Sequence, residues 1–169
     1  HVQWDFPDGA DPAIAKCAEK LGVRIGAVNP NVFQDQCYKY GSLANRRDDV
    51  RRRAIRHCQD SIDIAKKLGS KVLSVWLADG TNYPGQDDIA ARRRRLLDSL
   101  KEIYAAMPGD MTMLLEYKPF EPAFYLTDIA DWGMALALCR RLGDRAKVLV
   151  NPQGDLFGHE PDPAARHLR

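Results

Sequence analysis

The feature that most constrains the fold is a regular alternation of short apolar runs with longer amphipathic segments. Five short runs are rich in Val, Leu and Ile, as is typical of strands buried on both faces. They cover residues 1–6, 23–30, 71–77, 111–117 and 146–150. Between them lie four segments with helical periodicity, at residues 11–22, 45–69, 88–107 and 127–143. This order predicts an α/β domain with parallel strands and right-handed crossovers.

Two architectures share this order of elements, a doubly wound open sheet and a (β/α) barrel. A complete barrel needs about 250 residues. The chain has 169 residues, so it could supply only about five of the eight β/α units. No G-x-G-x-x-G or Walker pattern follows a predicted strand, and this removes the usual nucleotide-binding signals of the doubly wound class. The residues by themselves leave both architectures open.

The composition is that of one ordinary globular domain. Apolar residues make up 45% of the chain, and its formal net charge of +2 is too small to imply a polyanionic partner. No apolar run reaches the roughly 18 residues of a membrane span. The four cysteines are widely spaced and form no C-x-x-C pattern, so we expect reduced thiols in a cytoplasmic protein. They are Cys17, Cys37, Cys58 and Cys139.

Both ends of the chain suggest a fragment of a longer protein. The chain begins with His1 inside a predicted strand, without a Met. We expect residues 1–150 to form the domain and residues 151–169 to form a divergent polar tail. The tail is Pro-rich and lacks periodicity, a composition compatible with disorder.

Polar and aromatic side chains gather at the carboxyl ends of the predicted strands. Ligands bind at these ends in either architecture. Carboxylate, amide, imidazole and amine groups occur there together with flat aromatic rings. The residues are His1, Trp4, Asp5, Asn29, Asn31, Phe33, Trp76, Asp79, Asn82, Tyr83, Glu116, Lys118 and Asn151. This mixture suits a polyhydroxylated substrate, whose hydroxyls need hydrogen bonds and whose C–H patches need apolar cover.

Glu116 and Lys118 end the fourth predicted strand, in the stretch "LLEYKPFEPAFY". Alternation along a strand places both on the same face as Leu114. A simple ion pair at the rim would explain them. If the face is a barrel interior, however, a buried carboxylate needs a cation or a metal. For Trp76, burial in the core is the simpler alternative to a ligand-binding role.

Two arginine-rich stretches, residues 46–56 and 92–95, fall within predicted amphipathic helices. Acidic residues accompany both, which favours a solvated outer face. The alternative is an electrostatic patch for nucleic acid. No recognition motif accompanies the charge, and the aromatic residues lie at the strand ends instead.

Four long stretches resemble the bacterial L-rhamnose isomerase family, whose members are xylose-isomerase-like TIM barrels. They read "VNPNVFQDQ", "KVLSVWLADGTNYPGQ", "LLEYKPFEPAFYLTDIADWGMA" and "AKVLV". The resemblance covers nearly all of residues 1–150 and implies a partial (β/α)8 TIM barrel of about five β/α units. It implies interconversion of aldoses and ketoses, such as L-rhamnose and L-rhamnulose. It also implies two divalent cations per site, typically Mn²⁺, and a homo-oligomer for the complete enzyme.

The resemblance assigns roles to individual residues. Glu116 matches a metal ligand, and Lys118 matches the lysine that contacts the sugar near the reacting carbons. His1 and Trp4 match a His and a Trp of the substrate pocket. Phe33 and Trp76 match aromatic residues that line this pocket. Such roles agree with general chemistry, because hard cations prefer carboxylate oxygens and an ammonium can stabilise charge developing on an oxygen.

The chain departs from the family pattern after residue 150. Asn151 stands where the family has an aspartate ligand, no His-His pair follows, and His159 is out of register. A frameshift, a truncated gene or a divergent end would each explain this. We therefore expect a part of a sugar isomerase that does not catalyse the reaction alone. The alternatives are a non-catalytic sugar-binding remnant and a basic nucleic-acid-binding module. The expected partner is a monosaccharide, with neither nucleic acid nor membrane.

Overall fold

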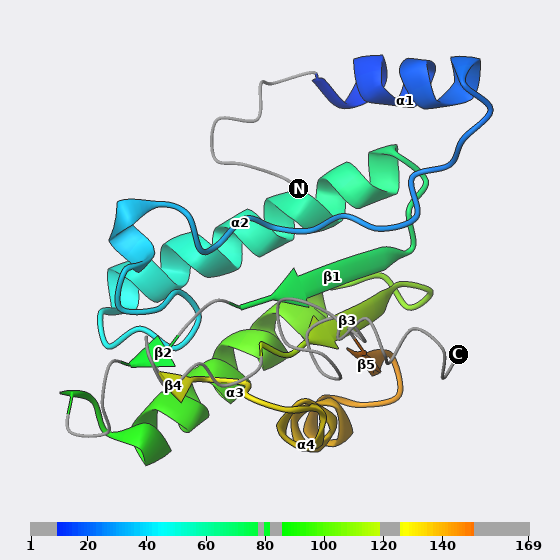
Figure 1. Ribbon diagram of the computed structural model, residues 1–169. Coiled ribbons are helices and arrows are strands. Elements are labelled where there is room, and N and C mark those ends of the chain that lie inside the picture. The colour runs from blue at the N-terminus through cyan, green and yellow to red at the C-terminus, as the bar shows by residue number, and fades with distance from the viewer. Residues whose placement is uncertain (1–9, 78–79, 82–85, 119–125, 151–169) are drawn as a thin grey trace, which may run out of the picture.

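The computed structural model describes residues 10–77, 80–81, 86–118 and 126–150 (Figure 1). Helices and strands alternate along most of this length, as predicted. In chain order the elements are α1 (Ala10–Lys20), a 3-10 helix η1 (Gln36–Tyr38), α2 (Asp48–Lys67), β1 (Val72–Trp76), β2 (Gly80–Thr81), α3 (Ile89–Ala106), β3 (Thr112–Glu116), β4 (Leu126–Thr127), α4 (Trp132–Leu142) and β5 (Ala146–Leu149).

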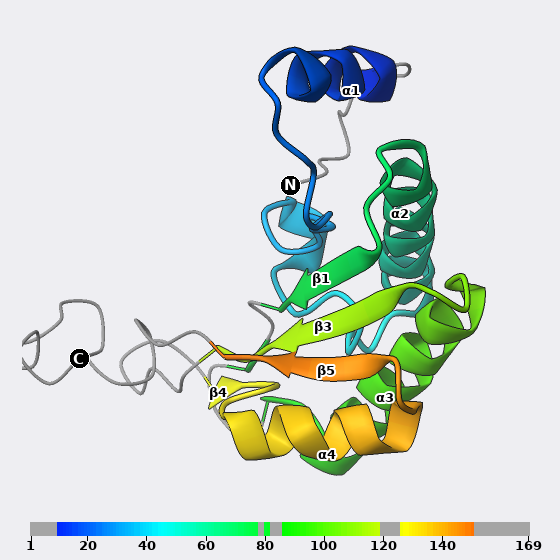
Figure 2. The same cartoon turned by 90° about the vertical axis from the view of Figure 1, so that its right-hand side faces the viewer.

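The main sheet has the order β1-β3-β5, and its three strands are parallel (Figure 2). Each of these strands is followed or preceded by a helix, so each neighbouring strand of the sheet belongs to the next β/α unit. The predicted α/β class and the partial-barrel architecture are confirmed. A second, two-stranded antiparallel sheet joins β2 to β4 beside the main sheet, and no sequence pattern had predicted it.

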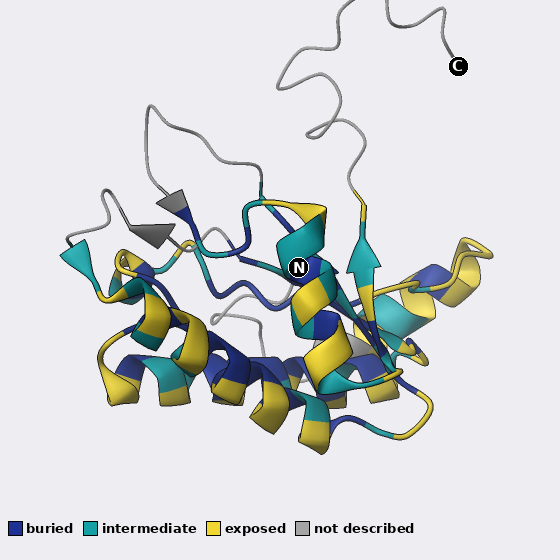
Figure 3. Cartoon of the chain, turned by 90° about the horizontal axis from the view of Figure 1, so that it is seen from below, coloured by how far each residue is buried: buried dark blue, intermediate teal, exposed yellow. Residues whose placement is uncertain are grey.

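Helices α2, α3 and α4 cover one face of the main sheet (Figures 1 and 2). The alternating burial in β3 identifies the two faces. Met113 and Leu115 are fully buried toward the core, whereas Leu114 and Glu116 are half-buried on the opposite face. The core also includes apolar stripes of α2 and α3, whose buried sides are dark blue in Figure 3. The half-buried face is the one that a closed barrel would enclose.

Aspartates at the helix N-termini decide where α3 and α4 begin. The side chain of Asp88 accepts the Ala91 N–H, and the side chain of Asp131 accepts the Met134 N–H. Each bond satisfies a backbone donor that the first turn leaves unpaired. The prediction that α4 starts at Thr127 is wrong, because Thr127 pairs with Gly80 in the β2–β4 ladder and the helix starts five residues later.

The strand predicted over residues 23–30 is also wrong in extent. Val28 and Pro30 are isolated bridge residues, and Val28 pairs with β1: its N–H donates to the Val72 carbonyl and its carbonyl accepts the Ser74 N–H. Pro30 has no N–H to donate to a ladder, and Gly26 has no side chain to pack. The segment therefore follows the edge of β1 without forming a regular strand.

Other predictions concern the thiols and the membrane. No disulfide joins the four cysteines, of which Cys58 and Cys139 are buried and Cys17 is exposed, and the reduced state of their thiols stays a prediction. Within the described ranges, no helix combines the length and the apolar character that crossing a membrane requires.

Candidate active site

The strand register brings two predicted site residues together at the carboxyl end of the sheet. Trp76 of β1 is paired with Glu116 of β3, which is paired in turn with Leu149 of β5. Neighbouring residues in register point to the same face of a parallel sheet. Trp76 and Glu116 therefore lie side by side, both half-buried, on the face away from the helices.

Phe33 reaches the same place from the loop that precedes α2. Its ring meets the Trp76 ring edge-on, with centroids 4.7 Å apart and planes at 87°. Such T-shaped pairs match the positive edge of one ring to the negative face of the other. Two of the three aromatic residues predicted for the substrate pocket, Phe33 and Trp76, are thus in contact, next to the predicted metal ligand.

Short-range hydrogen bonds fold the loop that carries Phe33. Asn31 and Gln34 lie on either side of Phe33 in the sequence. Nδ2 of Asn31 donates a hydrogen bond of 2.6 Å to Oε1 of Gln34. Asp35 then caps η1, where its Oδ1 accepts the Cys37 N–H at 2.9 Å. This bond, together with the Arg53 guanidinium at 2.9 Å, lowers the pKa of Asp35. An ionised Asp35 thus fixes the loop to α2.

Lys118 lies two residues after the end of β3 and is half-buried. Its backbone is held on both sides by the segment around β4. The Lys118 N–H donates to the Ile129 carbonyl at 2.9 Å, and its carbonyl accepts from Thr127 Oγ1 at 2.9 Å. The residue between these two partners is Asp128. The β4 segment therefore sets the position at which Lys118 leaves the sheet.

A buried network of ion pairs contacts the segment around β4 through Asp128. Arg92 of α3 donates from Nε and Nη2 to the two carboxylate oxygens of Asp128, at 2.6 and 2.8 Å. Its Nη1 donates to the Tyr40 carbonyl at 3.0 Å and contacts Asp87, which also pairs with Arg95. The side chain of Arg92 is only 3% exposed. The prediction of a solvated face for residues 92–95 holds for Arg93 and Arg94 and is wrong for Arg92.

This network was missed because its partners are distant in the sequence. Arg92 and Asp128 are 36 residues apart. One signal was present, since Arg92 lies four residues before Leu96 on the same stripe as Leu100 and Ile103. A charged residue on an apolar stripe indicates a buried partner.

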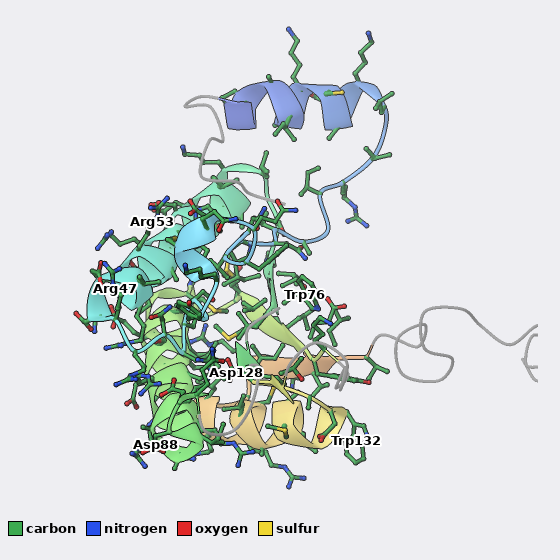
Figure 4. All side chains as sticks on the ribbon, turned by 60° about the vertical axis from the view of Figure 1, so that its left-hand side comes forward. Arg47, Arg53, Trp76, Asp88, Asp128 and Trp132 are labelled. Atoms are coloured by element: carbon green, nitrogen blue, oxygen red, sulfur yellow. The ribbon has the colours of Figure 1, made fainter. Side chains whose placement is uncertain are left out.

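By contrast, Arg47 at the N-cap of α2 and Arg53 within this helix lie at the surface (Figure 4). Arginines of this region pair with carboxylates within 4 Å, in the pairs Arg47–Asp49, Arg51–Asp48, Arg52–Glu102 and Arg53–Asp35. This neutralisation reduces the basic field that a phosphate backbone would need. The arrangement favours the solvated-face interpretation for this helix.

The sequence itself matches a known family over most of its length. The model of the xylose isomerase-like TIM barrel family matches residues 3–158. The chain belongs to this family. It is also 41% identical, over 168 residues and 96% of its length, to a probable sugar isomerase of Mesorhizobium japonicum. The L-rhamnose isomerase resemblance is thereby confirmed at the level of the xylose isomerase-like family and its sugar isomerases.

Solved structures share the fold of this family member at low identity. An AP endonuclease, family 2, from Brucella melitensis is 18% identical, with a TM-score of 0.67 over 88% of this chain and 55% of its own. A 3-keto-D-glucoside 4-epimerase from E. coli is 13% identical, with a TM-score of 0.64 over 94% of this chain and 59% of its own. The chain spans only 37% of the Mesorhizobium relative.

Several predicted site residues of this family member lie outside the described residues. These are His1, Trp4, Asp5, Asp79, Asn82, Tyr83 and Asn151, together with the whole predicted tail at 151–169. Within the described residues, no group of three or more His, Cys, Asp or Glu side chains could hold a metal ion. The described part of the site thus offers one predicted metal ligand, Glu116, beside an aromatic pair and Lys118.

Proposed function

We propose that this chain forms part of the active site of a metal-dependent aldose–ketose isomerase of the L-rhamnose isomerase type. The observation that carries the proposal is the β1–β3 register, which sets Trp76 beside Glu116 with Phe33 against the Trp ring. The relative described as a probable sugar isomerase supports the same class of reaction. The proposed substrate is a monosaccharide, and the proposed complete enzyme is a cytoplasmic homo-oligomer.

The described residues would divide the work in this reaction. The Phe33–Trp76 pair would cover a C–H face of the sugar and exclude water from it. Lys118 would place its ammonium near the reacting carbons, where it stabilises negative charge developing on a sugar oxygen. An aldose and its ketose are isomers, so the reaction needs no external oxidant or reductant.

The metal requirement is met only in part by these residues. Divalent cations such as Mn²⁺ and Mg²⁺ take several oxygen ligands, and Glu116 is a single carboxylate of suitable type. Once bound, such a cation polarises carbonyl and hydroxyl oxygens. We propose that Glu116 supplies one ligand and that the remaining donors lie outside the described residues.

Calorimetric titration with Mn²⁺ tests the role of Glu116 directly. We expect the protein to bind Mn²⁺ and the Glu116→Gln variant to bind it at least about tenfold more weakly, because a charged ligand is lost. Glu19→Gln, an exposed change on α1, is the control. Equal binding by the protein and Glu116→Gln would refute the metal role.

A turnover assay tests the reaction itself. The proposed complete enzyme that contains this chain is incubated with aldoses such as L-rhamnose, with added Mn²⁺ or with EDTA, and the ketose is measured; the chain alone is expected to form none. We expect ketose only in the presence of metal and none with Glu116→Gln. A lack of ketose in every condition would refute the proposed catalysis.

A sugar-binding protein without catalysis is the second candidate. It is favoured by the intact Phe33–Trp76 contact beside a single carboxylate ligand. This candidate predicts that a monosaccharide quenches Trp fluorescence, and that Trp76→Ala abolishes the effect, while no ketose forms. The arginines in and next to α2 form ion pairs with carboxylates, and this gives no support to a nucleic-acid partner.

A further inference from the structure

A contact path leads from the interior of the protein to Lys118. The role that we assign to this path rests on the proposed function, in which Lys118 contacts the sugar. The path ends at the backbone of Lys118, which bonds to both neighbours of Asp128. Thr127 donates to the Lys118 carbonyl, and Ile129 accepts the Lys118 N–H. Any shift of Asp128 would therefore move the point from which the Lys118 side chain extends.

Asp128 is held by the guanidinium group of Arg92, whose position is also fixed by other contacts. The fork of Arg92 matches both carboxylate oxygens, a geometry that lysine cannot reproduce. The Asp128 side chain is 10% exposed, so solvent screens the pair only weakly.

The other contacts of Arg92 fix its guanidinium to two further segments. Nη1 donates to the Tyr40 carbonyl, and Asp87 holds both Nη1 of Arg92 and Nη2 of Arg95. Gly41 has a φ of +105°, and a Cβ at this position would collide with Nη2 of Arg92. The backbone thus closes tightly over the guanidinium, which a larger residue at position 41 would prevent.

We propose that Arg92 is a positioning residue for Lys118. Through Asp128, it fixes the β4 segment, and the β4 segment fixes the backbone of Lys118. Arg92 does not touch the sugar. Its removal alters the reaction by displacing Lys118 from the reacting carbons. Displacements of about 1 Å in an active site can cost about 100-fold in rate.

The first test needs no substrate. Hydrogen exchange of the Lys118 amide is measured in the protein and in Arg92→Lys, which keeps the charge and loses the fork. We expect faster exchange at Lys118 in this variant. Arg93→Lys, an exposed change at the next position of α3, is the matched control and should leave the exchange unchanged. Unchanged exchange at Lys118 in Arg92→Lys would overturn the proposal.

Thr127→Val keeps the test decisive if Arg92→Lys fails to fold. This variant retains the shape of the side chain and removes only the bond to the Lys118 carbonyl. We expect it to accelerate exchange at Lys118 as well. If Thr127→Val is folded and Lys118 remains as protected as in the unchanged protein, the contact path is refuted.

The second test uses kinetics in two backgrounds. In the proposed complete enzyme, otherwise unchanged, we expect Arg92→Lys to lower kcat by about tenfold or more, with a much smaller change in KM. In a Lys118→Met background, the same change should lower kcat no further. A purely structural role would reduce the active fraction equally in both backgrounds, and that result would overturn the proposal.

Different results would refute the proposed function and the positioning role of Arg92. If the proposed complete enzyme produces no ketose with added metal, the proposed function is refuted. The exchange measurement still decides whether Arg92 holds Lys118 in place. If turnover is present but exchange at Lys118 is indifferent to Arg92, the proposed function stands and the positioning role falls.

Discussion

Asp88 shows how a single carboxylate couples the start of a helix to pH. Its bond to the Ala91 N–H favours the ionised form and lowers the pKa of Asp88 below its ordinary value of 3.8. A group with a lowered folded-state pKa adds stability above its unfolded pKa. This stability is lost as the pH falls through the folded pKa.

We predict that Asp88→Asn loses less stability than the unchanged protein between about pH 4 and about pH 2. Asn caps a helix nearly as well as Asp but does not titrate. The measurement is the urea midpoint across this pH range. Asp98→Asn, an exposed change in the middle of α3, is the control. Identical pH profiles for Asp88→Asn and the unchanged protein would contradict the prediction.

The positions of residues that depend on their neighbours in the sequence were predictable. The positions of residues whose contact partners lie far away in the sequence were not. The shared face of Leu114 and Glu116 follows from strand alternation alone. The partner of Arg92 does not follow from any local pattern, because only the packing of β4 against α3 creates it. The proposed roles of His1 and Trp4 stay predictions.

At the level of elements, helix α3 ends against the side chain of a residue from another unit. Arg145, just before β5, donates to the carbonyls of Pro108 and Tyr104 at 2.9 and 3.3 Å. Its guanidinium also lies over the Tyr104 ring, 4.2 Å from the centroid. A cation at this end compensates carbonyls that the last turn leaves unpaired.

We predict that Arg145→Met destabilises the protein by about 1–3 kcal/mol, because charge-assisted bonds to several carbonyls are lost together. Urea unfolding measures this difference. Arg140→Met, on the exposed side of α4, should change the free energy of unfolding by less than about 0.5 kcal/mol. Similar losses in both variants would show that Arg145 has no special role in ending α3.

Elements with strong periodicity were predicted to within a few residues, as α2, α3 and β3 show. The predicted boundaries were wrong where other hydrogen bonds compete with those of the predicted element. Thr127 has the chemistry of a helix cap, yet it bonds the Lys118 carbonyl instead. Residues 23–30 have the apolar pattern of a strand, yet they form only isolated bridges at Val28 and Pro30, and Pro30 has no N–H to donate.

At the scale of the whole molecule, the sheet has free edges within the described residues. β5 pairs with β3 alone, and Val28 makes only an isolated bridge beyond β1. A (β/α) barrel removes such edges by closure. The partial barrel was predictable from chain length, because a complete barrel needs about 250 residues. The exact register was not, since it depends on packing between strands.

We predict that this chain, studied alone, associates through the β5 edge. Val150 follows β5 and is 58% exposed, which adds an apolar contact to the unpaired backbone groups. Light scattering should give a molar mass that rises with concentration. Val150→Lys should reduce this rise, because a charge at a sheet edge opposes pairing. Leu21→Lys, at an exposed apolar residue after α1, should leave the rise unchanged. An equal reduction by both variants would point to general hydrophobic contact, and no reduction by Val150→Lys would exclude the β5 edge as the site of association.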